Sequence, residues 1–215
     1  MPSRAHAVKP DPVAIAAPAR YHHGALRAAL LAAAEVVIAE RGVDGFSLRE
    51  VARRAGVTPG APRHHFPDAR ALLTAVAAGG FADLGAALAD ADAAAMQVTG
   101  RDPGARVRAQ GEAYVRFALA HPARFDVMWR RTRVDVADPA YAAASQQAFD
   151  VLLAAVDVAP TGVRPVEADP RALASWSVVH GFARLALDGA FGVGPGAAHA
   201  AAVQLLPALL ATLRV

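Results

Sequence analysis

The stretch SLREVARRAGVTPGAPRHHFPDARALL, residues 47–73, places a helix start, a glycine stop and several prolines close together. Ser47 followed by Glu50 matches a capping box, in which the hydroxyl and the carboxylate each accept a backbone N–H. A helix is therefore predicted to begin at Leu48. Gly56 ends it, because glycine readily adopts the left-handed conformation that follows a helix.

A second short helix is predicted directly after this glycine. Thr58 can cap its N-terminus and Pro59 suits the first helical position, so the helix is expected to reach Phe66. Pro62 removes one early hydrogen bond, so packing must hold the helix in place. Asp68 then caps a long following helix. Two short helices joined by a glycine-containing turn are the pattern of a helix-turn-helix.

The rest of the sequence favours helices throughout. Hydrophobic residues make up 55% of the 215, with much alanine and few alternating β-type runs. An apolar stripe predicts a first helix over 25–41, and residues 1–19 contain four prolines and are predicted to be a disordered arm. Further helices are predicted at about 105–120, 122–131, 139–158, 167–190 and 196–213. The expected fold is all-α, with a helix-turn-helix domain over 20–67 and a larger helical domain over 68–215.

Composition limits the possible partners and compartments. Residues 1–70 hold 10 Lys+Arg against 6 Asp+Glu, while the remainder has a formal net charge of −1. A basic N-terminal third indicates an anionic partner there, although a chance imbalance on a solvated surface explains the charge equally well. The chain has no cysteine, no N-terminal apolar signal segment and no uninterrupted run of 18 apolar residues. We therefore expect a cytoplasmic protein without disulfides or a membrane span.

The segment YHHGALRAALLAAAEVVIAERGVDGFSLREVARRAGVTPGAPRHHFPDARALLTAV, residues 21–76, resembles the DNA-binding domain of the tetracycline-repressor (TetR/AcrR) family. The resemblance implies an N-terminal helix-turn-helix and a C-terminal domain that binds an effector and forms a homodimer. The segment WSVVHGFARLALDG, residues 176–189, resembles a C-terminal motif of one branch of these regulators, named for its Trp, His and Gly.

Candidate DNA contacts follow from the placement of polar groups on the helix-turn-helix. Free N–H groups at helix N-termini bind phosphates, and an arginine can present two donors to a guanine edge. In the family a lysine is usual where Ala69 stands, and Arg70 is expected to replace it. The candidate DNA-binding residues are Arg20, Tyr21, His22, His23, Ser47, Thr58, Gly60, Arg63, His64, His65 and Arg70.

The predicted helix over 167–190 is apolar on two faces, so both faces should be buried. We assign one face to an apolar effector cavity and the other to a two-fold dimer interface. Any single aromatic residue is as readily explained as core. The candidate cavity residues are Phe117, Phe125, Met128, Trp129, Tyr141, Trp176 and His180. The candidate interface residues are Val178, Phe182, Leu185, Val203, Leu206 and Leu210.

Motifs for metal binding and catalysis are missing from the sequence. Adjacent histidines do not share a helix face, and no HExxH motif, nucleophile elbow or glycine-rich phosphate loop occurs. We expect no metal, no cofactor and no enzyme activity. The leading hypothesis is a homodimeric repressor, released from a palindromic double-stranded DNA operator by an unknown small apolar effector. The alternatives are a ligand-independent or architectural DNA-binding regulator, and an α-helical enzyme that uses the aromatic cavity.

Overall fold

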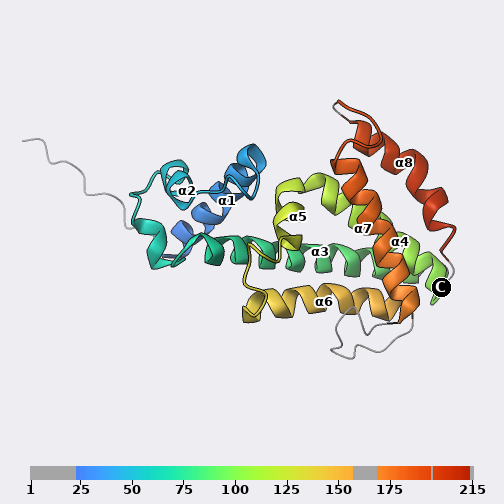
Figure 1. The fold of residues 1–215 in the computed structure, drawn as a ribbon. Coiled ribbons are helices and arrows are strands. Elements are labelled where there is room, and N and C mark those ends of the chain that lie inside the picture. The colour runs from blue at the N-terminus through green and yellow to red at the C-terminus, as the bar shows by residue number, and fades with distance from the viewer. Residues whose placement is uncertain (1–22, 157–168, 195, 214–215) are drawn as a thin grey trace, which may run out of the picture.

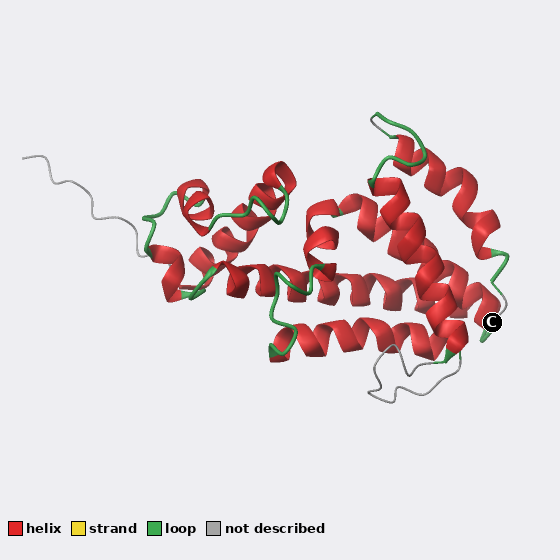
Figure 2. Ribbon diagram, in the orientation of Figure 1, coloured by secondary structure: helices red, strands yellow, loops and turns green. Residues whose placement is uncertain are grey.

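The computed structural model describes residues 23–156, 169–194 and 196–213, and all regular elements among them are helices (Figure 1 and Figure 2). The helices are α1 (His23–Arg41), α2 (Leu48–Arg54), the 3₁₀ turn η1 (Ala61–His64), α3 (Ala69–Thr99), α4 (Pro103–Ala120), α5 (Pro122–Trp129), α6 (Pro139–Ala155), α7 (Pro170–Leu187) and α8 (Ala197–Leu210). The predicted all-α class is confirmed. The predicted arm over 1–19 lies outside the described residues.

Asp-Pro pairs start three of the C-terminal helices, α4, α6 and α7. In each pair the aspartate is the N-cap and the proline occupies the first helical position. The carboxylates accept the backbone N–H two residues on, at 3.0 Å in α4, 3.0 Å in α6 and 2.7 Å in α7. Proline suits the first helical position because it lacks the N–H that a helix start leaves unpaired. Asp68 caps α3 in the same way, as predicted, accepting from Ala71 N at 2.8 Å.

α3 is the central element and joins the two parts of the molecule. Its N-terminal end packs against α1, and it then runs along α4, α5 and α6 (Figure 1). One apolar core follows it, from Leu30 in α1 to Leu210 in α8. Among the described helices, α3 alone is long and apolar enough to cross a membrane, yet 56% of its most apolar window is buried in the protein. That burial is the property of a core helix.

The C-terminal part is held together by close approach of α4, α7 and α8. Gly111 of α4 lies where these helices meet. A Cβ atom at this position would lie 2.8 Å from Leu210 Cδ2 and 3.1 Å from Val179 Cγ1. Only a glycine fits there without displacing its neighbours. This packing leaves a cavity between α3, α4, α6 and α7, described below.

Candidate DNA-binding surface and candidate ligand cavity

α2 begins at Leu48, as predicted, but the predicted capping box does not form. Ser47 is the N-cap residue with extended backbone angles, and its side chain makes no capping hydrogen bond. The Glu50 carboxylate turns instead to Arg53 and Arg54, accepting from Arg53 Nη2 at 2.7 Å and from Arg54 Nε at 3.2 Å. Arg53 is the main reason that the pKa of Glu50 falls to about 2. Two guanidinium groups outcompete one backbone N–H for the carboxylate.

The segment after α2 is shorter than the predicted helix over 59–66. It forms one 3₁₀ turn, Ala61–His64, with Gly60 rather than Thr58 as its N-cap residue. Its hydrogen bonds link residues three apart, such as Arg63 N to Gly60 O at 3.1 Å. Pro62 lacks the N–H that would continue an α-helix from Thr58, and its ring is buried. Phe66, where the predicted helix was expected to end, is buried with 3% of its surface exposed and anchors the segment by packing.

The candidate DNA-binding residues have different environments in the structure. Arg20, Tyr21 and His22 lie outside the described residues, as does the side chain of His23. The exposed candidates are Thr58, Gly60, Arg63 and His64, while Ser47 and His65 are partly exposed. They come from the start of α2 and from the 58–65 segment, so one surface of the helix-turn-helix presents them.

Arg70, the candidate DNA contact at the start of α3, is exposed and has contacts within the chain. Its Nη2 donates to the Val134 carbonyl at 3.0 Å and lies 3.8 Å from Asp135, and its contact with DNA stays a prediction. Arg70 is the second residue of α3. Its described contacts therefore tie the start of α3 to the segment between α5 and α6.

A basic hollow lies beside this surface, which the candidate list did not include. Its lining combines Ser47 and Glu50 at the start of α2 with three arginines and the loop that leads to η1. The arginines are Arg41, Arg49 and Arg53. Arg53 is paired with Glu50, whereas Arg49 is exposed and makes no ion pair among the described residues. The density of arginine in LREVARR was the sequence signal for this surface.

The C-terminal part encloses a mainly apolar cavity of about 260 Å³. Helices α3, α4, α6 and α7 and the end of α5 line it. The lining residues are Phe81, Leu84, Leu88, Val107, Gln110, Gly111, Tyr114, Trp129, Arg131, Tyr141, Ser145, Gln146, Ala148, Phe149, Leu152, Ser175, Trp176 and Val179. A largely apolar enclosure with a few polar groups is how small-molecule sites are built.

Aromatic rings in edge-to-face and tilted contact form much of the wall. The centroid of Trp129 lies 5.1 Å from that of Phe81 and 5.5 Å from that of Trp176. Phe81 also contacts Tyr141, at 5.4 Å. Each of these rings is held by another ring, so the wall is preorganised rather than collapsed. Tyr141 OH donates to the Met128 carbonyl at 3.1 Å, which further fixes α6 against α5.

His180 lies behind this wall and does not line the cavity. Its Nδ1 is 2.8 Å from the Tyr114 hydroxyl, and its ring contacts Trp129 at 4.8 Å. Burial lowers the pKa of His180, and the positive charge of Arg184 adds to that shift. Burial also raises the pKa of Tyr114. The pair is therefore a neutral hydrogen-bonded support for the aromatic wall.

The structure thus corrects part of the predicted cavity set. Trp129, Tyr141 and Trp176 line the cavity. Phe117 of α4 and Phe125 and Met128 of α5 are buried core residues outside its lining. The sequence reasoning missed Gln110 and Phe81, among others, because membership depends on which helices face one another. Their helical periodicity indicated burial but not a cavity.

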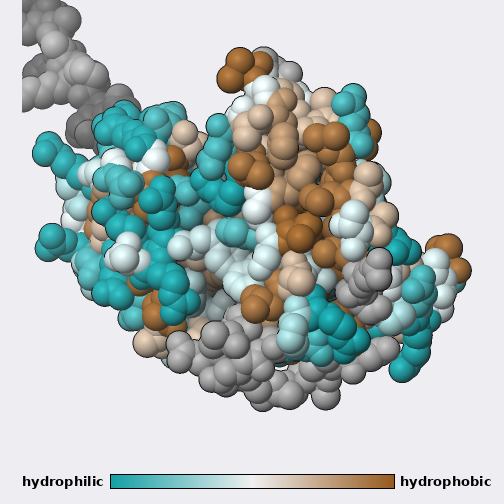
Figure 3. Space-filling model, turned by 45° about the vertical axis from the view of Figure 1, so that its right-hand side comes forward, coloured by the Kyte–Doolittle hydropathy of each residue, from teal (hydrophilic) through white to brown (hydrophobic). Residues whose placement is uncertain are grey.

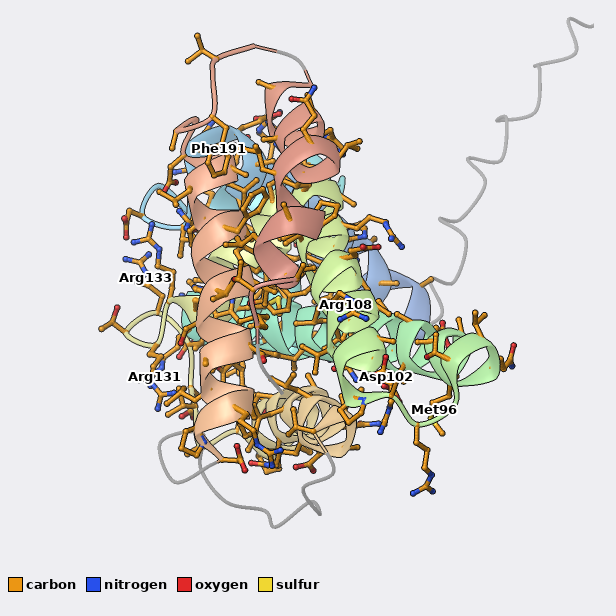
Figure 4. All side chains as sticks on the ribbon, turned by 90° about the vertical axis from the view of Figure 1, so that its right-hand side faces the viewer. Met96, Asp102, Arg108, Arg131, Arg133 and Phe191 are labelled. Atoms are coloured by element: carbon orange, nitrogen blue, oxygen red, sulfur yellow. The ribbon has the colours of Figure 1, made fainter. Side chains whose placement is uncertain are left out.

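The predicted interface residues fall into two groups, one buried in the core of the chain and one on its surface. Phe182, Leu206 and Leu210 are 5%, 2% and 1% exposed, so they belong to the core of a single chain. Phe182 packs against Phe191, with ring centroids 4.9 Å apart; Figure 4 labels Phe191 at the connection between α7 and α8. Val178 is partly exposed, and Leu185 and Val203 are exposed.

An apolar surface remains along α7 and α8. Figure 3 shows hydrophobic side chains gathered over this end of the molecule. The exposed large apolar residues on these two helices are Leu173, Leu185, Val203 and Leu205. A Cβ atom at Gly181, also on α7, would meet nothing within 4 Å.

Comparisons with known proteins agree with this architecture. Residues 30–76 match the family model for bacterial regulatory proteins of the tetR family, and residues 107–209 match the model for a tetracyclin repressor-like C-terminal domain. The first match covers the helix-turn-helix, and the second covers most of the cavity. A search of curated proteins finds no match.

Solved structures share the whole fold. A protein of unknown function from Rhodococcus sp. RHA1 is 34% identical, with a TM-score of 0.69, covering 93% of this chain and 100% of its own. A regulatory protein of the tetR family from Rhodococcus RHA1 is 21% identical, with a TM-score of 0.64 and coverage of 87% and 96%. RolR in complex with resorcinol is 24% identical, with a TM-score of 0.51 and 88% coverage of both chains.

The fold and the site together define a helix-turn-helix regulator with a helical C-terminal domain. The chain belongs to the TetR family of bacterial regulatory proteins and is a DNA-binding transcriptional regulator. Family membership implies a regulator rather than an enzyme, and TetR-family regulators typically act as dimers on DNA operators. The Trp-His-Gly motif over 176–189 is consistent with the branch suggested by the sequence.

Proposed function

We propose that this protein is a homodimeric, cytoplasmic repressor that leaves a palindromic operator when a small, mainly apolar molecule fills the C-terminal cavity. The 20–67 domain would place Arg63 and its neighbours in the major groove, and the 68–215 domain would bind the effector and the second subunit. Resorcinol, the ligand in the RolR complex, is a small aromatic molecule. The aromatic lining of this cavity suits a ligand of that general kind.

The observation that carries the proposal is a single segment shared by the cavity and the DNA-binding head. Trp129 and Arg131 of this segment line the cavity. A few residues on, Arg133 Nη2 donates to the Val43 carbonyl at 3.0 Å, and its guanidinium lies 3.6 Å from Asp44. Arg131 and Arg133 project from the connection beside α7 in Figure 4. Val43 and Asp44 lie in the turn between α1 and α2.

Further contacts attach this region to α3 and, through Arg124, to α1 of the head. The Asp135 N–H donates to Thr74 Oγ1 of α3 at 2.8 Å. At the other end of α5, Arg124 Nε lies 2.8 Å from Glu35 of α1, and Arg124 also pairs with Asp83 of α3. A ligand that displaces Trp129 would therefore disturb the contacts with α1, α3 and the α1–α2 turn. This disturbance would favour one of two orientations of the head over the other, which is a population shift.

The first test selects operators from a random duplex library with the full-length protein. We expect sequences with two inverted half-sites, because a two-fold dimer presents two equivalent heads. Selected sequences without two-fold symmetry would contradict the palindromic operator. A small-molecule screen then uses operator release as its readout. A ligand that binds the cavity without changing operator affinity would favour the ligand-independent regulator, and chemical conversion of the ligand would favour the enzyme.

The second test breaks the coupling. Arg133→Ala removes the guanidinium that reaches Val43 and Asp44, so we expect the ligand to bind as before but to release the operator less effectively. Arg108→Ala is the matched control, because Arg108 also forms an exposed ion pair, 3.8 Å from Asp102, and this pair lies within the C-terminal part, at the start of α4. Equal ligand responses of the two variants would contradict this coupling route.

A further inference from the structure

Gln110 presents a hydrogen-bond acceptor that has no partner in the cavity wall. The residue is 2% exposed and lines the cavity from α4. Its Nε2 donates to Asp92 Oδ1 at 2.9 Å and to the Val151 carbonyl at 3.1 Å. Its Oε1 is buried and makes no hydrogen bond. Most buried polar atoms are paired, so this oxygen needs an explanation.

The orientation of this amide is fixed by its neighbours. Arg106 binds the Asp92 carboxylate through two hydrogen bonds, of 3.0 and 2.8 Å, which anchors that carboxylate between α3 and α4. Turning the Gln110 amide over would set its oxygen against two acceptors, Asp92 and the Val151 carbonyl. Gln110 therefore offers an acceptor and not a donor, so a ligand group that pairs with it must donate.

Trp129 presents the complementary group. Its Nε1 is buried without a hydrogen-bond partner, and an indole N–H can only donate. Phe81 and His180 hold the ring on two sides, at 5.1 and 4.8 Å between centroids. A ligand group that pairs with Trp129 must therefore accept. The two orphaned atoms come from residues of the same cavity lining.

The charge of the lining excludes other classes of ligand. Among the lining residues Arg131 alone carries a formal charge at neutral pH, and it is exposed. A cationic ligand would meet this positive charge and no compensating carboxylate. A carboxylate ligand would accept from Trp129 but cannot donate to Gln110, and solvent screens its attraction to the exposed Arg131. A hydroxyl or a carboxamide both donates and accepts without a charge to desolvate.

We infer that the effector is an uncharged, flat and mainly apolar molecule whose hydroxyl or carboxamide group donates to Gln110 Oε1 and accepts from Trp129 Nε1–H. The inference rests on the proposed ligand-responsive function of this cavity and specifies the chemistry of its ligand. The aromatic wall recognises the flat body, and the two orphaned atoms recognise the polar group. A ligand without that group leaves both atoms unpaired.

Three matched aromatic probes test this chemistry on the full-length protein without DNA: naphthol, methylnaphthalene and naphthoate. Calorimetry measures affinity, and tryptophan emission reports occupancy, because the two tryptophans of the chain, Trp129 and Trp176, both line the cavity. We expect naphthol to bind about tenfold or more tightly than methylnaphthalene, and naphthoate to bind more weakly than naphthol. The inference would be overturned if naphthol did not bind, if naphthol and methylnaphthalene bound with equal affinity, or if naphthoate bound more tightly than naphthol.

Two tryptophan variants locate the polar contact. Trp129→Phe keeps an aromatic ring but removes the orphaned N–H, so the preference for naphthol over methylnaphthalene should shrink. Trp176→Phe is the matched control, since Trp176 Nε1 is not among the buried unpaired atoms of the described residues, and the preference should persist. Gln110→Met removes the acceptor independently, and circular dichroism checks the fold of each variant. An unchanged preference in folded Trp129→Phe and Gln110→Met would overturn the assignment.

Operator release by naphthol is measured separately, on DNA selected as above. Binding with the expected preference but without release would contradict the proposed function and leave the ligand chemistry standing. If methylnaphthalene and naphthol bound the protein with equal affinity and both released it from the operator, the ligand chemistry would be contradicted and the proposed function supported. The two failures are therefore distinguishable.

Discussion

Arg63 is the side chain best placed on η1 to meet a base edge. It is exposed, it belongs to a turn whose Gly60 and Ala61 are small, and it makes no ion pair among the described residues. We expect Arg63→Ala to weaken operator binding by about 1–3 kcal/mol and to relax preference at one base pair per half-site. Affinities across an operator library measure both effects.

The control for this prediction is Arg116→Ala, which removes the same charge from an exposed position on α4. It should lower affinity little and uniformly, because long-range charge carries no sequence information. Identical sequence preferences for Arg63→Ala and the unmodified protein would refute the base contact.

His180 gives a pH dependence of stability whose sign follows from burial. Its pKa in the folded protein lies below the ordinary value of 6.5, mainly because of burial. Above pH 6.5 the His180 imidazole is neutral in both the folded and the unfolded protein, so the free energy of unfolding has its full value. As the pH falls, the unfolded chain takes up the proton first, so stability is lost between 6.5 and the lower folded pKa.

Urea unfolding at a series of pH values checks this expectation. His180→Gln should reduce the loss of stability on acidification, whereas His199→Gln, at an exposed position of α8, should leave it unchanged. A His180→Gln protein with the full acid dependence would show that other groups cause it.

At the scale of single elements, local signals predicted helix starts well. Asp68 and the Asp-Pro pairs cap backbone N–H groups two or three residues away, so these helix starts can be predicted from the local sequence. The Ser47–Glu50 capping box failed because Glu50 accepts from Arg53 and also from Arg54, whose guanidinium reaches Glu40 of α1 as well. That competition involves a second helix. The cavity set was partly wrong for the same reason: periodicity gives the buried face but not the helix opposite.

The junction of α4, α7 and α8 supplies an element-scale prediction. Gly111→Val would push side-chain atoms into Leu210 and Val179, which already lie within 3.1 Å of an added Cβ. We expect destabilisation of about 1–3 kcal/mol from overpacking, measured by urea unfolding. Gly24→Ala, near the start of α1 where an added Cβ meets nothing within 4 Å, is the control and should be neutral or stabilising. A fully stable Gly111→Val protein would mean that these helices separate easily.

At the scale of the whole molecule, the sequence correctly predicted a second apolar surface on α7 but misassigned some of its members. Phe182 points into the chain's own core, so a Phe182→Glu substitution would unfold the protein rather than test a dimer. The exposed members are Leu185 on α7 and Val203 on α8, at 51% and 77% exposure. A one-residue change of position turns a side chain by about 100° around a helix, which a periodicity argument resolves poorly.

The dimer proposal is therefore best tested at Leu185. Leu185 lies one turn from Gly181, whose Cα faces open space, so a second helix can approach closely on this side. Leu185→Glu would bury a charge in such an interface and should yield a folded monomer. Operator affinity should fall by about 10²-fold or more, because the two heads would no longer bind as one unit. Val98→Glu, at an 85% exposed position near the end of α3, is the control and should remain dimeric. Light scattering gives the mass and circular dichroism the helicity; a folded, still dimeric Leu185→Glu protein would place the interface elsewhere.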